Sequence, residues 1–143
     1  MSNLNPTAAA PDALQALTDL SRIAGDGLAP DLAELVSLHV SQLNGCTYCT
    51  GLHRKGALAA GQSSAKLAAL DGWADSAEFT PAERAGLALA EHLTRPVGGT
   101  VPADVHAEAA RHLGDTATVR LTWTIAATNA WNRIGIAATS LNQ

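Results

Sequence analysis

The sequence predicts an all-α protein with about six to eight helices in a single domain. Its composition is the first indication, because hydrophobic residues make up 47% of the 143 positions and aromatic residues only 3%. Alanine and leucine dominate the hydrophobic set, which favours closely packed helices over sheets. The second indication is that apolar side chains recur at helical spacing in the long segments, and that Gly or Pro separates these segments. A chain of this length can bury one core without disulfide staples.

The N-terminal part is expected to hold a loose arm followed by the first helix. Residues 1–11 are rich in Asn, Pro, Thr and Ala and are predicted to form the arm, so that residues 12–143 form the domain. Asp12 is the expected N-cap of the first helix, because its carboxylate can accept a hydrogen bond from a free backbone N–H. Gly25 should end this helix.

The next two helices are predicted to form a hairpin. The first should open at Pro30. Its apolar stripe has the spacing of a buried helix face and consists of Leu32, Leu35, Val36, His39, Val40 and Leu43. Gly45 should end this helix, since glycine tolerates the positive φ that closes a helix C-terminus. The second helix should begin around Cys46 to Thr47 and end at Gly61.

The remaining helices are expected in the second half of the chain. They should cover residues 63–70, 80–95, 102–113 and a long last stretch from 115 onward. The clearest start is at Thr80, where Thr80 and Glu83 form a capping box and Pro81 takes the first helical position. The last helix carries Trp123 and Trp131.

Charge and composition limit the classes of partner. A net charge of −4 and a calculated pI near 5.6 argue against nucleic acid, which calls for a basic face. We find no run of about 18 apolar residues that could span a membrane. Residues 1–10 lack the basic and apolar regions of a signal peptide. Two cysteines in CxxC spacing without a targeting segment predict a cytoplasmic protein with redox or metal chemistry.

The CxxC motif places chemistry at the start of a helix. Cys46 and Cys49 are the two cysteines of the chain, and His53 follows four residues after the second. On a helix, i, i+3 and i, i+4 spacing puts all three side chains along one face. Backbone N–H groups and the positive end of the helix dipole favour a thiolate there. His53 is then placed to take the proton of Cys49 or to stabilise its anion.

Glu34 is the fourth candidate site residue. It lies about as far before the turn as His53 lies after it, so antiparallel helices bring both to similar heights. A carboxylate at this position can orient the imidazole, as a third group orients the base in a nucleophile–base pair.

Plainer interpretations compete with this one. Cys46, Cys49 and His53 could be zinc ligands, with His39 as the fourth ligand that a structural site needs. The cysteines could also be inert core residues. His39 lies on an apolar stripe and is either a core histidine or a catalytic one. Three other histidines lie on charged helix faces and need no function: His92, His106 and His112.

The motif Glu34-x11-Cys46-x2-Cys49-x3-His53 resembles the AhpD-like alkylhydroperoxidase branch of the carboxymuconolactone decarboxylase superfamily. The resemblance continues through Gln42 to Gly45, Gly56 to Gly61, Thr80 to Arg84 and Asn129 to Arg133, and covers roughly residues 15–140. In the best studied members a second histidine precedes the second cysteine, where this chain has Tyr48. The resemblance implies an AhpD-like helical domain.

The resemblance also implies a function. It implies a thiol-dependent peroxidase that reduces organic hydroperoxides, with Cys49 peroxidatic, Cys46 resolving, and Glu34 and His53 relaying the proton. It further implies a lipoyl-bearing or thioredoxin-like reductant and a homo-oligomer, a trimer or a hexamer, to whose contacts Trp123 and Trp131 would contribute. No cofactor is expected, since the sequence has no glycine-rich phosphate loop after a strand. Two alternatives stay open: a redox sensor that uses the same disulfide, and a lactone decarboxylase, although members with that activity lack the CxxC pair.

Overall fold

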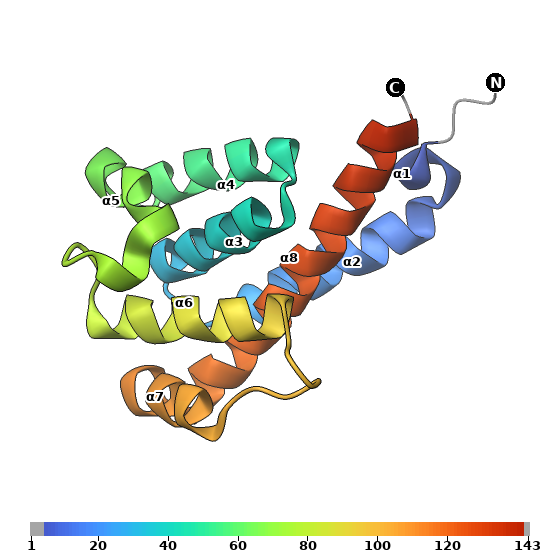
Figure 1. Ribbon diagram of the computed structural model, residues 1–143. Coiled ribbons are helices and arrows are strands. Elements are labelled where there is room, and N and C mark those ends of the chain that lie inside the picture. Colours follow the sequence, from blue (N-terminus) through green and yellow to red (C-terminus); the bar gives the residue numbers. More distant parts are fainter. Residues whose placement is uncertain (1–4, 142–143) are drawn as a thin grey trace.

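The computed structural model describes residues 5–141 and is built from helices (Figure 1). The elements are α1 (Pro6–Ala9), α2 (Pro11–Gly25), α3 (Pro30–Asn44), α4 (Thr47–Ala59), α5 (Ser64–Ala68), the 3-10 helix η1 (Leu70–Asp75), α6 (Pro81–Thr94), α7 (Ala103–Leu113) and α8 (Asp115–Leu141). Within the described range, the one β interaction is an isolated bridge between Val97 and Thr100. The all-α prediction is therefore confirmed. None of the described helices is long and apolar enough to cross a membrane.

Helix α3 is the centre of the fold. It packs against α4, α6 and α8, and Figure 1 shows it between α4 and α6, with α8 running obliquely past its end. Most of its apolar stripe is buried, and Leu35, Val36, Leu38 and Val40 are fully inaccessible, whereas Leu43 near its end is partly buried. Burial of these side chains removes about 1.5–3 kcal/mol of unfavourable hydration for each. A helix held this firmly is a rigid base for the turn that follows it.

The structure differs from the sequence prediction for the N-terminal segment. Residues 1–4 lie outside the described residues. Within the expected loose arm, Pro6–Ala9 forms the short helix α1, capped by the Asn5 side chain, and α1 contacts α2 and α8. Helix α2 begins at Pro11, so Asp12 is not its N-cap. The fixed φ of proline suits the first helical position, and the Asp12 carboxylate instead accepts the N–H of Ala13 within the first turn.

Two helix starts predicted from capping residues later in the chain are confirmed. Ser63 caps α5 by accepting the N–H of Lys66. Thr80 and Glu83 form the expected capping box at the start of α6. The segment around Trp73, which lies between two of the predicted helices, folds as η1. The guanidinium of Arg84 fixes this segment. It donates hydrogen bonds to the carbonyls of Trp73 and Ala74 in η1 and of Ser76 directly after it.

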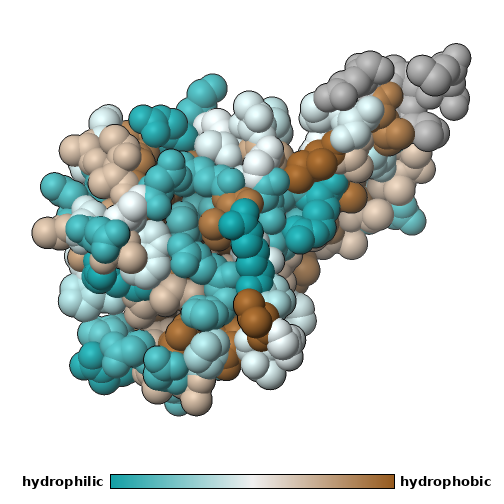
Figure 2. Space-filling view, viewed as in Figure 1, coloured by the Kyte–Doolittle hydropathy of each residue, from teal (hydrophilic) through white to brown (hydrophobic). Residues whose placement is uncertain are grey.

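The two ends of the described chain lie together. Helix α1, part of α2 and the C-terminal half of α8 project from the bundle as an arm (Figure 1). Figure 2 shows apolar side chains along this arm. Ile134, Ile136 and Leu141 of α8 are exposed. The N-terminal half of α8, by contrast, buries Leu121 and Ile125 in the core.

Candidate redox site

The turn that carries Cys46 is fixed from both sides. Gly45 ends α3 in the left-handed conformation, with φ of 70°. Its N–H donates to the carbonyl of Gln42 at 3.1 Å, and the N–H of Cys46 donates to the carbonyl of Ser41 at 3.2 Å. This pair of bonds is the Schellman motif, which satisfies free carbonyls at a helix C-terminus. Cys46 is also the N-cap of α4, so its backbone closes one helix and opens the next.

Cys46 and Cys49 are joined in a disulfide. Their Cα atoms are 5.3 Å apart, within the usual range for this bond. The N–H of Cys49 donates to Sγ of Cys46 at 3.3 Å, so that sulfur occupies the place of an N-cap acceptor. Both residues are nearly inaccessible, with 3% and 5% of their surface exposed. The helix N-terminus therefore acts most directly on Cys46, while Cys49 lies within the first turn.

Glu34 and His53 are in contact across the helical hairpin. Oε2 of Glu34 lies 2.9 Å from Nδ1 of His53. Because α3 and α4 run antiparallel, residues equally far from the turn meet. The contact occupies Nδ1, which leaves Nε2 as the ring nitrogen that can exchange a proton with another group. His53 is one helical turn from Cys49 on α4.

Gly56 makes the Glu34 contact possible. A Cβ at this position would lie 2.5 Å from Oε2 of Glu34, closer than real Cβ contacts occur. The carboxylate thus fills the space that the glycine leaves on α4. Sequence reasoning noted Gly56 only as part of the family resemblance. Its position inside a helix, where glycine is unfavourable, is the signal that could have singled it out.

Gly135 of α8 lies over the disulfide. A Cβ there would be 3.0 Å from Sγ of Cys46 and 3.3 Å from Sγ of Cys49. Helix α8 can therefore approach the sulfurs this closely only with a small residue at the contact. Sequence reasoning missed Gly135, although it too is a glycine inside a long helix.

A buried amide network joins α8 to the turn. Asn132 is fully buried, and its Nδ2 donates to Oγ of Ser41 at 3.0 Å. Nδ2 of Asn44 donates to Oδ1 of both Asn132 and Asn129, each at 2.9 Å. Ser41 is the residue whose carbonyl holds Cys46. Asn129 and Asn132, which lie in a segment that carries the family resemblance, thus hold the turn in place.

Two hollows flank these groups. One, of about 310 Å³, is lined by Glu34, His53 and Trp131 with neighbouring residues of α2, α3 and α8. The indole N–H of Trp131 donates to Oγ of Ser21 at 2.7 Å, which fixes one wall. The other, of about 140 Å³, is lined by Cys46 and by residues of α8 that include Gly135. The imidazole–carboxylate pair and the disulfide therefore border different spaces.

His39 belongs to another cluster. It is buried, and its Nε2 lies 2.8 Å from Oε1 of Glu91 on α6. The indole N–H of Trp73 donates to the same oxygen at 2.8 Å. Burial raises the pKa of Glu91, but the hydrogen bonds from Trp73 and His39 outweigh it and hold that pKa below 4.5. These contacts are those of a core histidine. Across residues 5–141, no three His, Cys, Asp or Glu residues are grouped so that they could hold a metal ion.

Comparison with known families gives a direct result. The profile of the carboxymuconolactone decarboxylase family matches residues 11–92, which include α3, the turn and α4. The chain belongs to this family.

Two relatives extend the match beyond the profile. The uncharacterized protein YdfG of Bacillus subtilis is 30% identical over 129 residues, which cover 90% of this chain and 88% of YdfG. The crystal structure of ATU0492 from Agrobacterium tumefaciens, a protein of unknown function and a candidate antioxidant defence protein AhpD, superposes with a TM-score of 0.90. It is 29% identical, and the match covers 98% of this chain and 97% of that one. The family member described here therefore has the AhpD-like fold.

Proposed function

We propose that this member of the family is a thiol-dependent peroxidase that reduces organic hydroperoxides. The observation that carries the proposal is the intramolecular disulfide of Cys46 and Cys49 with the Glu34–His53 pair one helical turn further along α4. A dithiol that closes within one turn of a helix can cycle between two oxidation states without large rearrangement. A carboxylate-oriented imidazole supplies the base that the cycle needs.

The proposed reaction begins with the reduced pair. His53, oriented by Glu34, takes the proton of Cys49. The thiolate attacks the distal oxygen of the hydroperoxide, the O–O bond breaks, and the alkoxide leaves as an alcohol with the proton from His53. Cys49 is then a sulfenic acid. Cys46 attacks its sulfur, the S–O bond breaks, water leaves, and the disulfide forms.

Further observations support this proposal. The candidate assignment of ATU0492 to antioxidant defence concerns a protein with the same fold. The hollow of about 310 Å³ beside Glu34 and His53 offers room for the organic part of a substrate. We propose no cofactor, because the two thiols can carry the electrons. A lipoyl- or thioredoxin-like dithiol would restore the reduced state, and a reducing cytoplasm is the compartment that suits this cycle.

The test is consumption of cumene hydroperoxide by the wild type, Cys49→Ser and Cys46→Ser with a panel of dithiol reductants. Repeated turnover is expected only in the wild type. Cys49→Ser should not react, while Cys46→Ser should react once and stop at the sulfenic acid. A wild type that is oxidised stoichiometrically but does not turn over with any reductant would instead indicate a redox sensor. Lactone decarboxylation by Cys49→Ser would point to the activity that names the family.

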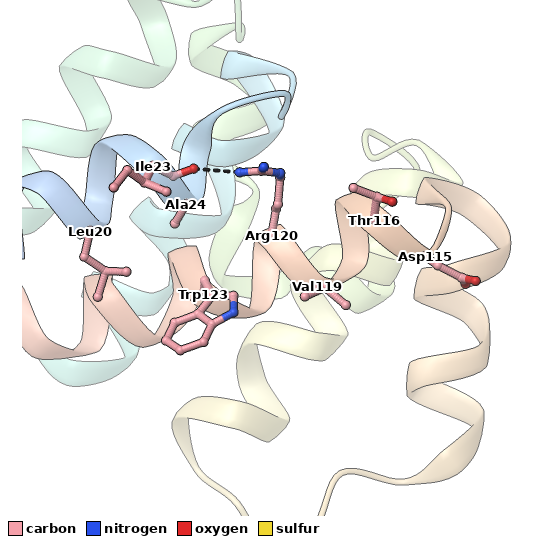
Figure 3. A pocket seen from close by; sticks show the side chains of 8 residues that line it. All are labelled: Leu20, Ile23, Ala24, Asp115, Thr116, Val119, Arg120 and Trp123. Carbon is pink, nitrogen blue, oxygen red and sulfur yellow. Dashed lines mark hydrogen bonds between the residues drawn. The ribbon is translucent and has the colours of Figure 1, made fainter.

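We also propose that the protein is a homo-oligomer. A groove of about 550 Å³ runs between the end of α2 and the start of α8, and apolar side chains dominate it (Figure 3). Trp123 is 55% exposed at its edge, and Ile23 and Val119 are exposed beside it. The guanidinium of Arg120 donates to the carbonyl of Ile23 at 2.7 Å and thereby ties the two helices together (Figure 3). An exposed apolar surface of this kind is typical of a contact between protein subunits.

A further inference from the structure

A hollow on the α8 side of the disulfide reaches one of its two cysteines. Cys46 lines the hollow of about 140 Å³ between the start of α4 and the C-terminal half of α8, and Cys49 does not line it. Both cysteines are almost inaccessible otherwise. Any reductant must bring a thiolate to one of the two sulfurs, so this asymmetry decides which sulfur it meets.

Gly135 controls the width of this hollow. It is one of the residues that line it, and a Cβ at 135 would lie 3.0 Å from Sγ of Cys46. Such a Cβ would occupy the space directly over the disulfide. Glycine weakens a helix interior relative to alanine, so its presence in α8 calls for a local reason. The close approach of α8 to the disulfide is that reason, because any side chain at 135 would press on both sulfurs.

We infer that the disulfide is reduced from the α8 side, by attack of a thiolate on Cys46 through the hollow that Gly135 borders. This inference rests on the proposed function in one respect, that the disulfide is the oxidised state of a working dithiol. It adds which sulfur the donor attacks, which residue borders its route and what kind of donor fits.

The chemistry assigns each sulfur a different source of stabilisation. The donor thiolate forms a bond to Sγ of Cys46, the Cys46–Cys49 bond breaks, and Cys49 leaves as a thiolate that receives a proton from His53. The second thiolate of the donor then attacks the donor sulfur of the mixed disulfide, and Cys46 leaves as a thiolate. The N–H of Cys49, 3.3 Å from Sγ of Cys46, is in place to stabilise that anion. Two electrons pass to the protein, and the donor leaves as a disulfide.

The lining of the hollow indicates the class of donor. Besides Cys46, the described residues that line it are Gly45, Thr47, Gly135, Ile136, Thr139 and Ser140, and none carries a charge. The hydroxyls of Thr139 and Ser140 donate back to helix carbonyls, of Gly135 at 3.0 Å and of Ile136 at 2.8 Å. A volume of about 140 Å³ is small beside the roughly 300 Å³ or more of ordinary ligand pockets. The site fits a thiol on a narrow, uncharged arm.

The first experiment locates the attack. The oxidised wild type is mixed with 2-mercaptoethanol, a neutral monothiol, and the reaction is quenched early with N-ethylmaleimide. Tandem mass spectrometry of the peptide then shows which cysteine carries the mixed disulfide and which carries maleimide. We expect mercaptoethanol on Cys46 and maleimide on Cys49. The opposite pattern, or an equal mixture, overturns the inference.

The second experiment tests whether a side chain at position 135 slows reduction of the disulfide. Reduction of the disulfide by dithiothreitol should be about tenfold slower or more in Gly135→Ala than in the wild type, because small displacements of an attacking group have effects of this size. Alanine suits a helix interior, so the variant should fold. Gly51→Ala is the matched control, since it is the same change inside α4 and its Cβ would meet no atom within 4 Å. Equal rates in the two variants, or faster reduction in Gly135→Ala, overturn the inference.

The third experiment tests the class of donor by comparing an anionic thiol with a neutral one. Anionic 2-mercaptoethanesulfonate should reduce the protein several-fold more slowly than 2-mercaptoethanol, after both rates are divided by those with free 2-hydroxyethyl disulfide. Equal normalised rates would contradict the neutral donor. These assays contain no peroxide. The peroxidase proposal fails if the reduced protein does not consume hydroperoxide, whichever cysteine the thiol attacks, so the two failures are distinguishable.

Discussion

At the scale of single residues, the central question is how Cys49 becomes reactive. The end of a helix contributes about 0.3–1 kcal/mol to an adjacent charge, whereas a shift of one pKa unit requires about 1.4 kcal/mol. In this structure the N-terminus of α4 acts most directly on Sγ of Cys46, which accepts the N–H of Cys49. In the proposed mechanism, activation of Cys49 then depends mainly on His53. The contact between His53 and Glu34 gives this argument a test.

The first prediction concerns that contact. His53→Gln should slow the reaction of the reduced protein with hydroperoxide about a hundredfold or more, the range for loss of a general base. Glu34→Gln should slow it by on the order of tenfold, because the imidazole loses orientation but stays present. The measurement is the single-turnover rate of thiol loss under excess peroxide.

The double variant provides the control for this prediction. Glu34→Gln combined with His53→Gln should be little slower than His53→Gln alone, because the glutamate acts through the histidine. Two losses that multiply would mean that Glu34 has its own route to the thiol, and the relay proposed here would be wrong.

The second prediction concerns Gly56. In Gly56→Ala the new Cβ would overlap the carboxylate of Glu34, which must move because a Cβ cannot approach to 2.5 Å. The carboxylate is the flexible end of its side chain, so the fold should be kept while the contact with His53 is lost. We expect the same fall in peroxide reactivity as in Glu34→Gln, with thermal stability equal to or above that of the wild type. Gly51→Ala, with open space around its Cβ, should have neither defect.

The residues of the site divide according to what a sequence can reveal. Cys46, Cys49, His53 and Glu34 carry reactive groups, and helical spacing was enough to predict which of them share a face. Gly56 and Gly135, which lie beside them, carry no reactive group. Their role is the absence of a Cβ at a contact between helices, which depends on tertiary packing and leaves no periodic signal.

At the scale of elements, local rules predicted two helix starts at which a side chain caps the helix. Thr80 with Glu83 and Ser63 are examples, because their hydrogen bonds lie within three residues of the cap. The sequence failed at the N-terminus. Helix α1 has only four residues and is marginal by itself, and it also contacts α2 and α8. Contacts between segments far apart in the chain cannot be deduced from a local pattern.

Glu83 caps α6 and also takes part in contacts that join α6 to α5 and α3. Its carboxylate is buried and accepts hydrogen bonds from the N–H of Thr80 at 2.9 Å, from Lys66 at 2.8 Å and from Gln62 at 3.0 Å. Gln62 also donates to the carbonyl of Asp31 at the start of α3. Burial raises the pKa of Glu83, but the hydrogen bonds from Lys66, Thr80 and Gln62 together lower it below 4.5.

The third prediction follows from the sign of that shift. A carboxylate whose pKa is lowered by folding stabilises the protein fully above its ordinary pKa near 4.5, and this contribution is lost as the pH falls through the lower folded value. The free energy of unfolding should therefore decrease on acidification below about pH 4.5. Glu83→Gln should remove part of this dependence and cost about 3 kcal/mol at pH 7, since the partly buried Lys66 loses its charged partner.

The measurement is urea unfolding between pH 3 and pH 7 at one protein concentration. Glu78→Gln, a change of the same kind at an exposed position, should keep the acid dependence of the wild type. An identical pH profile in Glu83→Gln would show that other groups cause acid unfolding.

At the scale of the whole molecule, the distribution of apolar surface is the remaining feature to explain. The bundle around α3 hides its apolar side chains, whereas the groove of α2 and α8 exposes Trp123, Ile23 and Val119. Trp131, which the sequence also assigned to subunit contacts, is partly buried and hydrogen-bonded to Ser21 within the same chain. The contact surface should therefore be centred on Trp123. Composition and periodicity placed both tryptophans on one helix but could not tell which faces outward, because that depends on where α2 lies.

The last prediction is that Trp123→Glu disrupts the assembly. The wild type should be a trimer or a hexamer by light scattering across the micromolar range. A carboxylate at the edge of an apolar interface would be desolvated without a partner, at a cost of several kcal/mol per contact, which is enough to dissociate the subunits. Val97→Glu is the matched control, because Val97 is even more exposed but does not line the groove. It should leave the mass unchanged. Since Trp123 lies on the half of α8 that is remote in sequence from Gly135, dissociated Trp123→Glu should still form the Cys46–Cys49 disulfide. A monomeric wild type, or a Trp123→Glu variant that keeps the wild-type mass, would show that this groove has another role.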